Sequence, residues 1–100
     1  IFIKMIIYSS LKKKEINNNQ RIDNWLYRLR FAKTRGAAQK IIKDGKVRIN
    51  KIKIKKPSNK IKYGDIITLN KNNQILVIEV IGFTKRRLNY RNAKTYYQIL

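Results

Sequence analysis

The hydrophobic pattern of this 100-residue chain changes its period once, near Gly45, and that change limits the folds open to it. Before Gly45, apolar residues recur at the three- and four-residue spacing of a helix face. After it they alternate with polar residues, as in strands with one buried side. We therefore predict an α+β fold, in which two short helices pack on a small, mostly antiparallel sheet.

The first helix is predicted over residues 23–31, from an apolar stripe with helical spacing. The stripe consists of Ile22, Trp25, Leu26 and Leu29. Asp23 is the candidate N-cap, because its carboxylate can accept hydrogen bonds from the free amides of the first turn. Trp25 could serve as a stacking platform for bases, but its place on the stripe favours the core. Three arginines lie off the stripe and should face solvent or a ligand: Arg21, Arg28 and Arg30.

The second helix is predicted over residues 35–43. Thr34 is a suitable N-cap, and Gly45 suits the left-handed residue that closes a helix. The inner face would be Ala37, Ala38, Ile41 and Ile42, and the outer face would carry Gln39, Lys40 and Lys43. Lys33 and Arg35 flank the helix start, where positive charge opposes the helix dipole. A phosphate between them would remove this conflict; the alternative is a plain solvated face.

Beyond Gly45 we predict a hairpin whose strands meet at Asn50-Lys51. Its apolar face is Val47, Ile49, Ile52 and Ile54, and its basic face is Arg48, Lys53 and Lys55. Pro57-Ser58 ends the pattern. The later sheet elements are, in order, a turn at Gly64-Asp65, a strand over 66–69, a turn at 71–73, a strand over 75–81 and an end at Gly82.

The charge of the chain points to a polyanionic ligand. Lysine and arginine number 25 against five carboxylates, so the net charge is +20. The densest region is 33–62, with twelve basic residues and one acid. Nucleic acid is favoured over an anionic membrane surface. Biased codon use could supply some lysines, although not the arginines or the shortage of acids. With no cysteine, no histidine and scattered carboxylates, we expect no metal, cofactor or catalysis.

The two ends of the chain are predicted to lie outside a domain over residues 21–84. Residues 1–20 are interpreted as a disordered leader, or an arm that orders on RNA, in which Met5 could be the true start; an extra edge strand over 2–8 is the alternative. Residues 85–100 are interpreted as a basic tail, beginning with Lys85-Arg86-Arg87, or a short helix over 89–100. The apolar side of that helix would be Ala93, Tyr96, Tyr97 and Leu100. Its tyrosines could stack on bases, but docking on the sheet is favoured.

Residues 21 to about 62 resemble the RNA-binding domain named after small-subunit ribosomal protein S-four, also called the alpha-L motif. The resemblance is carried by R-I-D-N-W-L at 21–26, R-F-A-K-T-R at 30–35, D-G-K-V-R-I-N at 44–50 and K-P-S at 56–58. The tryptophan of the first motif and the K-T-R of the second are most similar to the stand-alone bacterial members, of the fifteen-kilodalton heat-shock type. Gly64-Asp65, Arg86-Arg87 and Tyr96 also match that subgroup.

The resemblance implies a bacterial, cytoplasmic, non-enzymatic factor, with RNA lying across the second helix and the hairpin. Such a factor binds ribosomal RNA of free large subunits that still carry a nascent chain, and recycles them under heat stress. Contacts with tRNA or the nascent chain stay open, no membrane or cofactor is implied, and a monomer is expected. By position, the RNA contacts would come from Lys33, Thr34, Arg35, Gln39, Lys43, Lys46, Arg48, Asn50, Lys55 and Ser58.

Three features depart from the family pattern. Gly36 replaces a larger residue early in the second helix, Lys51 replaces the usual hairpin glycine, and the long basic C-terminal extension of the typical heat-shock member is missing. Two other functions also stay open. One is a stand-alone quality-control factor that aids C-terminal tailing of stalled chains. The other is the RNA-binding fragment of a pseudouridine synthase, whose catalytic domain these residues could not build.

Overall fold

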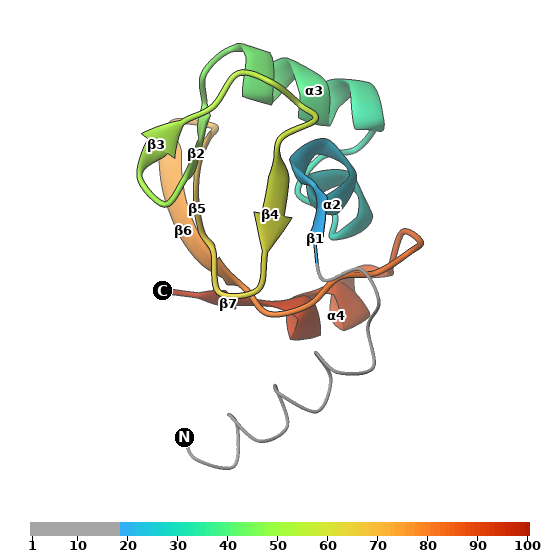
Figure 1. The fold of residues 1–100 in the computed structure, drawn as a ribbon. Helices are drawn as coiled ribbons and strands as arrows, with labels where there is room; N and C mark the ends of the chain where they lie inside the picture. The colour runs from blue at the N-terminus through green and yellow to red at the C-terminus, as the bar shows by residue number, and fades with distance from the viewer. Residues whose placement is uncertain (1–18) are drawn as a thin grey trace.

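A computed structural model describes residues 19–100 (Figure 1). The edge strand predicted over 2–8, and the rest of 1–18, lie outside the described residues. In chain order the elements are β1 (Asn19–Arg21), α2 (Ile22–Arg28), α3 (Arg35–Lys43), β2 (Val47–Ile49), β3 (Ile52–Lys53), β4 (Lys60–Lys62), β5 (Ile66–Lys71), β6 (Gln74–Val80), α4 (Tyr90–Ala93), a 3-10 turn (Lys94–Tyr96) and β7 (Tyr97–Ile99).

The strands form two antiparallel sheets beside the helices. The larger sheet has the order β3-β2-β5-β6-β7, and β1 pairs with β4 in a separate two-stranded sheet. Helices α2 and α3 lie on one side of the larger sheet, and β4 runs between them and the sheet in the view of Figure 1. The predicted α+β architecture, with two short helices on a mostly antiparallel sheet, is therefore confirmed.

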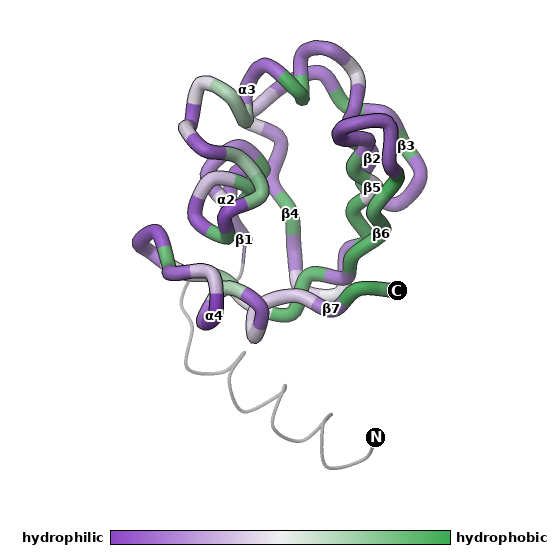
Figure 2. Tube along the Cα trace, turned by 180° about the vertical axis from the view of Figure 1, so that it is seen from behind, coloured by the Kyte–Doolittle hydropathy of each residue, from purple (hydrophilic) through white to green (hydrophobic). Residues whose placement is uncertain are grey.

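The core lies between the helices and the inner face of the larger sheet. Alternate residues of the strands point into it, and β5 and β6 carry long apolar stretches (Figure 2). The buried residues of α2 and its C-cap, α3 and the two sheets include Ile22, Trp25, Leu26, Leu29, Ala38, Ile42, Val47, Ile61, Ile67, Leu69, Ile78 and Val80. Trp25 is fully buried, and its Nε1 donates to the Gly82 carbonyl over 3.0 Å. The prediction that Trp25 belongs to the core is thus confirmed, and it cannot stack on bases.

Helix α2 differs from its prediction at both ends. Its N-cap is Arg21, without a side-chain cap, so the assignment of Asp23 as N-cap was wrong. The first amides are satisfied by the chain before β4 instead, because Ile22 N donates to Asn59 O and Asp23 N donates to Pro57 O, over 2.8 and 3.3 Å. The helix also ends at Arg28, three residues before the predicted 31, and Arg30 then adopts a φ of 69°.

Helix α3 has the predicted bounds because both end signals are local. The Thr34 hydroxyl accepts a hydrogen bond from Ala37 N over 2.9 Å, which satisfies an amide of the first turn. At the other end Gly45 has a φ of 76°, a backbone conformation that is strained for a residue with a side chain. The Gly45 N donates a hydrogen bond to Ile42 O. One assignment on this helix was wrong: Gln39 is half-buried against α2 rather than on the outer face.

The hairpin turn forms where it was predicted. Asn50 and Lys51 have φ values of 50° and 73°, and Ile49 pairs with Ile52, so the loop is a two-residue turn with both residues left-handed. Its backbone twist matches that of the flanking strands, and Lys51 adopts a positive φ that glycine would adopt without strain.

The end of the chain continues the larger sheet. The helix predicted over 89–100 stops at Ala93, and Tyr97–Ile99 instead forms strand β7, with Tyr97 opposite Val80 of β6. Ala93 is buried and Tyr97 packs against the core, so the predicted docking is confirmed. Leu100 is 62% exposed, contrary to its predicted place on the apolar side.

Candidate nucleic-acid interface

Six of the predicted contact residues are exposed cations that have no partner among residues 19–100. Within residues 19–100, no ion pair or side-chain hydrogen bond involves them. They are Lys33, Arg35, Lys43, Lys46, Arg48 and Lys55. The nearby carboxylates are engaged elsewhere: Asp23 pairs with Arg21, and Asp44 pairs with Lys40 over 3.7 Å. These six positive charges are therefore available to an external anion.

The first group of cations surrounds the start of α3. Lys33, Thr34 and Arg35 line a surface hollow together with Tyr27 of α2. No acidic residue lies in the first turn of α3, and its free amides and dipole add positive potential there. Positive side chains at this helix end would be stabilised by an anion seated in the hollow.

The second group lies at the other end of α3 and on the hairpin. Strand register places Arg48 directly opposite Lys53 on one side and Thr68 on the other. A second hollow of about 550 Å³ is lined by Gly45, Lys46, Arg48, Lys51, Lys53, Thr68, Asn70 and Ile75. Helix α3 has nine residues and so keeps the two groups about 13 Å apart.

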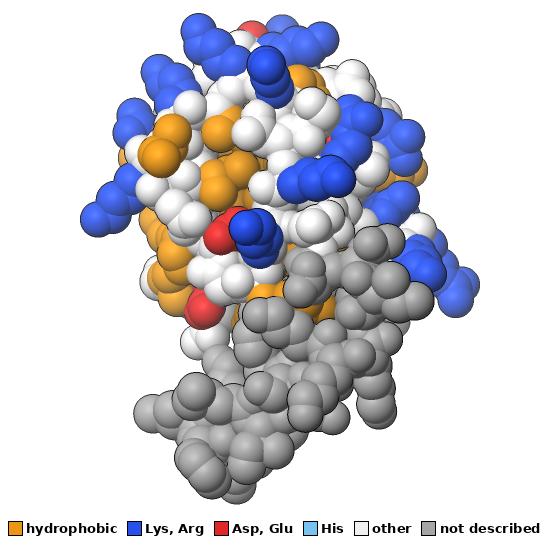
Figure 3. Space-filling view, in the orientation of Figure 1, with side chains coloured by type: hydrophobic (Ala, Val, Ile, Leu, Met, Phe, Trp, Pro, Cys, Tyr) orange, Lys and Arg blue, Asp and Glu red, His pale blue; other side chains and the backbone are white. Residues whose placement is uncertain are grey.

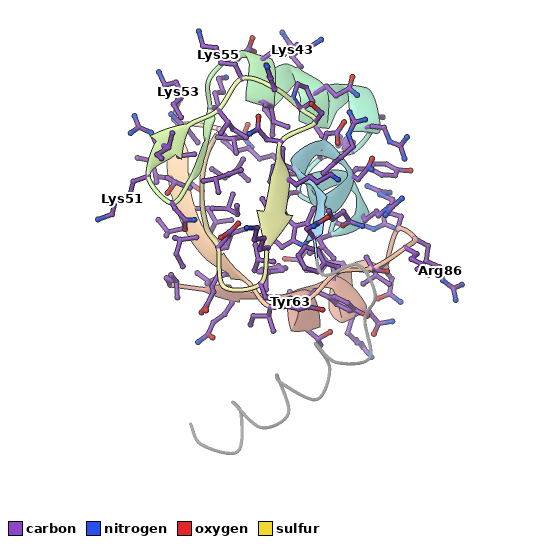
Figure 4. All side chains as sticks on the ribbon, viewed as in Figure 1. Lys43, Lys51, Lys53, Lys55, Tyr63 and Arg86 are labelled. Carbon is purple, nitrogen blue, oxygen red and sulfur yellow. The ribbon has the colours of Figure 1, made fainter. Side chains whose placement is uncertain are left out.

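Further lysines extend the second group along one edge of the molecule. Lys43, Lys55, Lys53 and Lys51 follow one another from the end of α3 round the hairpin and point outward (Figure 4). Lys and Arg side chains crowd the same upper border in the space-filling view, where few acids are visible (Figure 3). We call Lys33, Arg35, Lys43, Lys46, Arg48, Lys51, Lys53 and Lys55 the α3–hairpin surface.

Three predicted contact residues have structural partners instead of free side chains. Thr34 caps α3, and Gln39 donates to Asp23 over 3.1 Å. The Asn50 side chain donates to Asp65 and accepts from Ile66 N, over 3.1 and 2.9 Å, and so joins the hairpin turn to the next one. Ser58 is exposed in the turn before β4. Thr34, Gln39 and Asn50 therefore support the helix and the hairpin that carry the cations.

The structure also adds residues that the sequence-based contact set lacked. Lys51 and Lys53 line the hairpin hollow, and Tyr27 lines the one at the start of α3. The two lysines follow from the hairpin itself, since a two-residue turn at Asn50-Lys51 places residue 53 opposite Arg48. Tyr27 gave no such signal, because only the packing of α2 against α3 brings it there.

As predicted, the arginines around the first helix lie off its buried face, with Arg21 and Arg30 exposed and Arg28 half-buried, but each also has a partner within the fold. Arg28 and Arg30 donate to the carbonyls of Thr84 and Leu88, over 3.0 and 2.7 Å, and Arg21 pairs with Asp23.

Among residues 19–100 no group of acidic, cysteine or histidine side chains could hold a metal ion. No helix in the same range is long and apolar enough to cross a membrane.

The two-helix unit, the small sheet and the cationic edge together define a class of protein, a compact α+β domain that binds a polyanion. The family model of the S4 domain matches residues 20–67, and the chain belongs to the S4-domain family. This RNA-binding domain occurs in ribosome-associated proteins, and the assignment supports an RNA-binding role on the ribosome for this chain.

Two kinds of relative were found. A solved trimeric structure of Heat Shock Protein 15 from Vibrio cholerae is 30% identical, has a TM-score of 0.77 and covers 82% of each chain. The Heat shock protein 15 homolog of Haemophilus influenzae is 33% identical over 78 residues, which is 78% of this chain and 59% of that protein. Small ribosomal subunit protein uS4 of Phytoplasma mali is 36% identical over 72 residues, or 70% of this chain. The chain spans only about a third of such uS4 proteins (36%).

Proposed function

We propose that this protein is a non-enzymatic factor that binds ribosomal RNA by seating its sugar–phosphate backbone on the α3–hairpin surface. The observation that carries the proposal is the set of exposed cations at both ends of α3, which lack carboxylate partners within residues 19–100. Keeping so many like charges along one edge is costly unless a polyanion neutralises them. Phosphates are the anions that a ribosome-associated domain of this family meets.

Recognition should depend on RNA shape and charge rather than on base sequence. The major groove of A-form RNA is too deep and narrow for side chains to read, so contacts fall on phosphates and 2′-hydroxyls. The lysines and arginines of the α3–hairpin surface are suited to phosphates, and the arginines can bind them in bidentate fashion. The two hollows lie toward opposite ends of α3 and would hold separate stretches of the backbone.

The proposed partner is the large ribosomal subunit, and the proposed role is to recycle subunits that retain a nascent chain after translation fails under heat stress. The match to Heat Shock Protein 15 over 82% of both chains supports this choice, because a match of that extent leaves little of either chain unaccounted for. The factor would act in the cytoplasm as a monomer, with tRNA or the nascent chain as further contacts.

The small subunit is the competing partner, because small-subunit protein uS4 is also among the relatives. That match covers only 36% of uS4, so most of the uS4 chain lies outside the aligned region. A quality-control factor that aids tailing of stalled chains is the other candidate from the same family. Its activity would require a tail-adding partner on the same particle.

Sedimentation of a bacterial lysate through a sucrose gradient, with detection of the tagged full chain, tests the proposal. We expect the protein with free large subunits, in larger amounts after heat shock, and nascent chains in the same fractions. Co-migration with small subunits would overturn the assignment of the partner. A fully free protein would overturn the proposed function, and capture of a tail-adding enzyme on the particle would favour the quality-control role.

A salt titration of RNA binding tests the mechanism. With about six phosphate contacts, log affinity should fall against log salt with a slope of about −4 to −5. The double variant Lys33→Ala/Arg35→Ala should lower the magnitude of that slope by about 1.5 and keep the wild-type unfolding midpoint. The matched control is Arg91→Ala/Lys94→Ala, which removes two exposed charges from α4 and the 3-10 turn after it, at the far end of the molecule from α3 (Figure 1). A slope near zero for the wild type would contradict phosphate contact.

A further inference from the structure

A second cationic segment, the 84–88 loop, is held rigidly beside α2. The Thr84 carbonyl accepts hydrogen bonds from Gln20 Nε2 and Arg28 Nη1, over 2.8 and 3.0 Å. Leu88 N donates to the Arg28 carbonyl over 3.0 Å, and the Thr84 hydroxyl bonds with both the N and the O of Arg86. The loop therefore has one defined conformation, fixed at both ends and across its middle.

Arg87 fastens this loop to the turn that precedes α3. Its Nε donates to Tyr27 O and its Nη2 donates to Ala32 O, over 3.1 and 3.2 Å. Its guanidinium carbon lies 4.7 Å from the centroid of the Tyr27 ring, in a cation–π contact. Both acceptors are uncharged carbonyls, so the positive charge of Arg87 is not neutralised. Ala32 directly precedes Lys33.

Tyr27 connects the loop to the α3–hairpin surface. One part of Tyr27 contacts Arg87, and the residue also lines the hollow that contains Lys33, Thr34 and Arg35. The loop lies beside α2 on the side where α3 begins, in the views of both Figure 1 and Figure 2. Arg87 therefore connects the loop to the first hollow through Tyr27.

The loop presents charge that no described residue balances. Lys85 and Arg86 are exposed, and Arg86 projects from the loop tip (Figure 4). Within residues 19–100 no ion pair reaches them; Asp23 and Asp44 pair with Arg21 and Lys40, and Asp65 bonds to Asn50. A flexible loop would let like charges move apart, whereas this one holds them close to Arg87.

We propose that the 84–88 loop is a second RNA-contact surface, on which Lys85 and Arg86 bind the phosphates that leave the hollow of Lys33 and Arg35. Arg87 is the positioning residue, because it sets the loop against Tyr27 and keeps it at that hollow. A fixed loop loses little conformational entropy when it binds, which favours a rigid cationic surface over a disordered basic tail. The proposal rests on the proposed function and extends the path of the same RNA.

The first test compares the double variant Lys85→Ala/Arg86→Ala with the Arg91→Ala/Lys94→Ala control, on a labelled RNA duplex of about 20 base pairs. Two lost phosphate contacts should lower the magnitude of the salt slope by about 1.5 and weaken binding about tenfold or more near 0.1 M salt, with little change in the control. Equal slopes for the two variants would overturn the proposal. A wild type that does not bind RNA would instead overturn the proposed function.

The second test locates the contact directly. Because the chain contains no cysteine, Arg86→Cys and Arg91→Cys each provide a single attachment point for a photo-crosslinker. We expect the label at residue 86 to crosslink the RNA duplex and the label at residue 91 not to. Crosslinking from residue 91 alone would place the RNA on another face and overturn the proposal.

Arg87→Lys tests the positioning role. Lysine keeps the charge but cannot donate to two carbonyls from one planar group. If Arg87 positions the loop, the double variant Arg86→Cys/Arg87→Lys should lose the RNA crosslink that Arg86→Cys alone gives. An unchanged crosslink yield, in a variant with a wild-type unfolding midpoint, would rule out a positioning role for Arg87.

Discussion

Gln39 of α3 donates a hydrogen bond from Nε2 to Oδ2 of Asp23 on α2, over 3.1 Å. The carboxylate of Asp23 is fully buried and also accepts two hydrogen bonds from Arg21, over 3.1 and 2.9 Å. A third donor is Asn24 N, at 2.7 Å. One buried acid therefore joins the two helices and sets how α3 presents its cations, although neither Asp23 nor Gln39 carries positive charge to the RNA.

Replacing Gln39 by glutamate should destabilise the fold. Gln39→Glu removes the donor and sets a second carboxylate against the buried Asp23, so we expect a loss of about 2 kcal/mol in the free energy of unfolding. Urea denaturation followed by circular dichroism measures it. Lys40→Gln makes the same change in net charge on the exposed face, where its ion pair with Asp44 is worth little, and should cost under about 0.5 kcal/mol. Equal midpoints for the two variants would contradict the role of Gln39.

Two glycines should respond in opposite ways to the same methyl group. A Cβ at Gly82 would lie 2.9 Å from Cδ2 of Tyr96, so Gly82→Ala should lower the free energy of unfolding by about 1–3 kcal/mol. A Cβ at Gly36 would meet only Thr34 Oγ1, at 3.9 Å, and Gly36→Ala should raise it by about 0.5 kcal/mol. Thermal denaturation of the pair checks both signs. A stabilising alanine at position 82 would mean that the Tyr96 ring moves aside freely.

Lys51 should show opposite effects on stability and on binding. It holds a φ of 73°, which glycine adopts without strain, so Lys51→Gly should raise the free energy of unfolding by about 0.5–1 kcal/mol. The same change removes a cation from the hairpin hollow and should reduce the magnitude of the RNA salt slope by about 0.8. Lys51→Gln is the matched control, because it loses the charge but keeps the strain. It should lower the slope equally without stabilising the fold.

Local signals in the sequence were sufficient to predict an element when residues close in sequence determine where it begins and ends. Thr34 and Gly45 fixed the bounds of α3, and Asn50 fixed the hairpin turn, since each acts through its own backbone conformation or the next few residues. The register of the hairpin then determines the basic face around Arg48. The cationic edge of the site could be predicted from the sequence for the same reason.

The misses involve contacts between residues far apart in sequence. Asp23 looked like an N-cap, but Asn59 and Pro57 already satisfy the first amides of α2, which leaves the carboxylate free to bond with Gln39. Strand β7 was assigned to a helix because its pairing with β6 is not visible in the local pattern of residues 97–99. Likewise, Tyr27 becomes part of the site only through the packing of α2.

The phenol of Tyr97 should make the fold sensitive to alkaline pH. Tyr97 lies on β7 with its ring centroid 4.7 Å from that of Phe31. Burial, and then the nearby Tyr90, raise the pKa of Tyr97 above the ordinary tyrosine value of 10.0. Because the folded pKa exceeds the unfolded one, the folded state favours the neutral phenol. This contribution is complete below the unfolded pKa and is lost as pH rises through the folded pKa.

We therefore expect the free energy of unfolding to fall more steeply between about pH 9 and pH 11 in the wild type than in Tyr97→Phe, which cannot ionise. Urea titrations at a series of pH values measure the slope, and the comparison cancels the lysines that titrate in the same range. Tyr90→Phe, which removes only the lesser cause of the raised pKa, should fall between the two. Parallel curves for wild type and Tyr97→Phe would mean that the phenol has the same pKa folded and unfolded, and that its burial against the core carries no electrostatic cost.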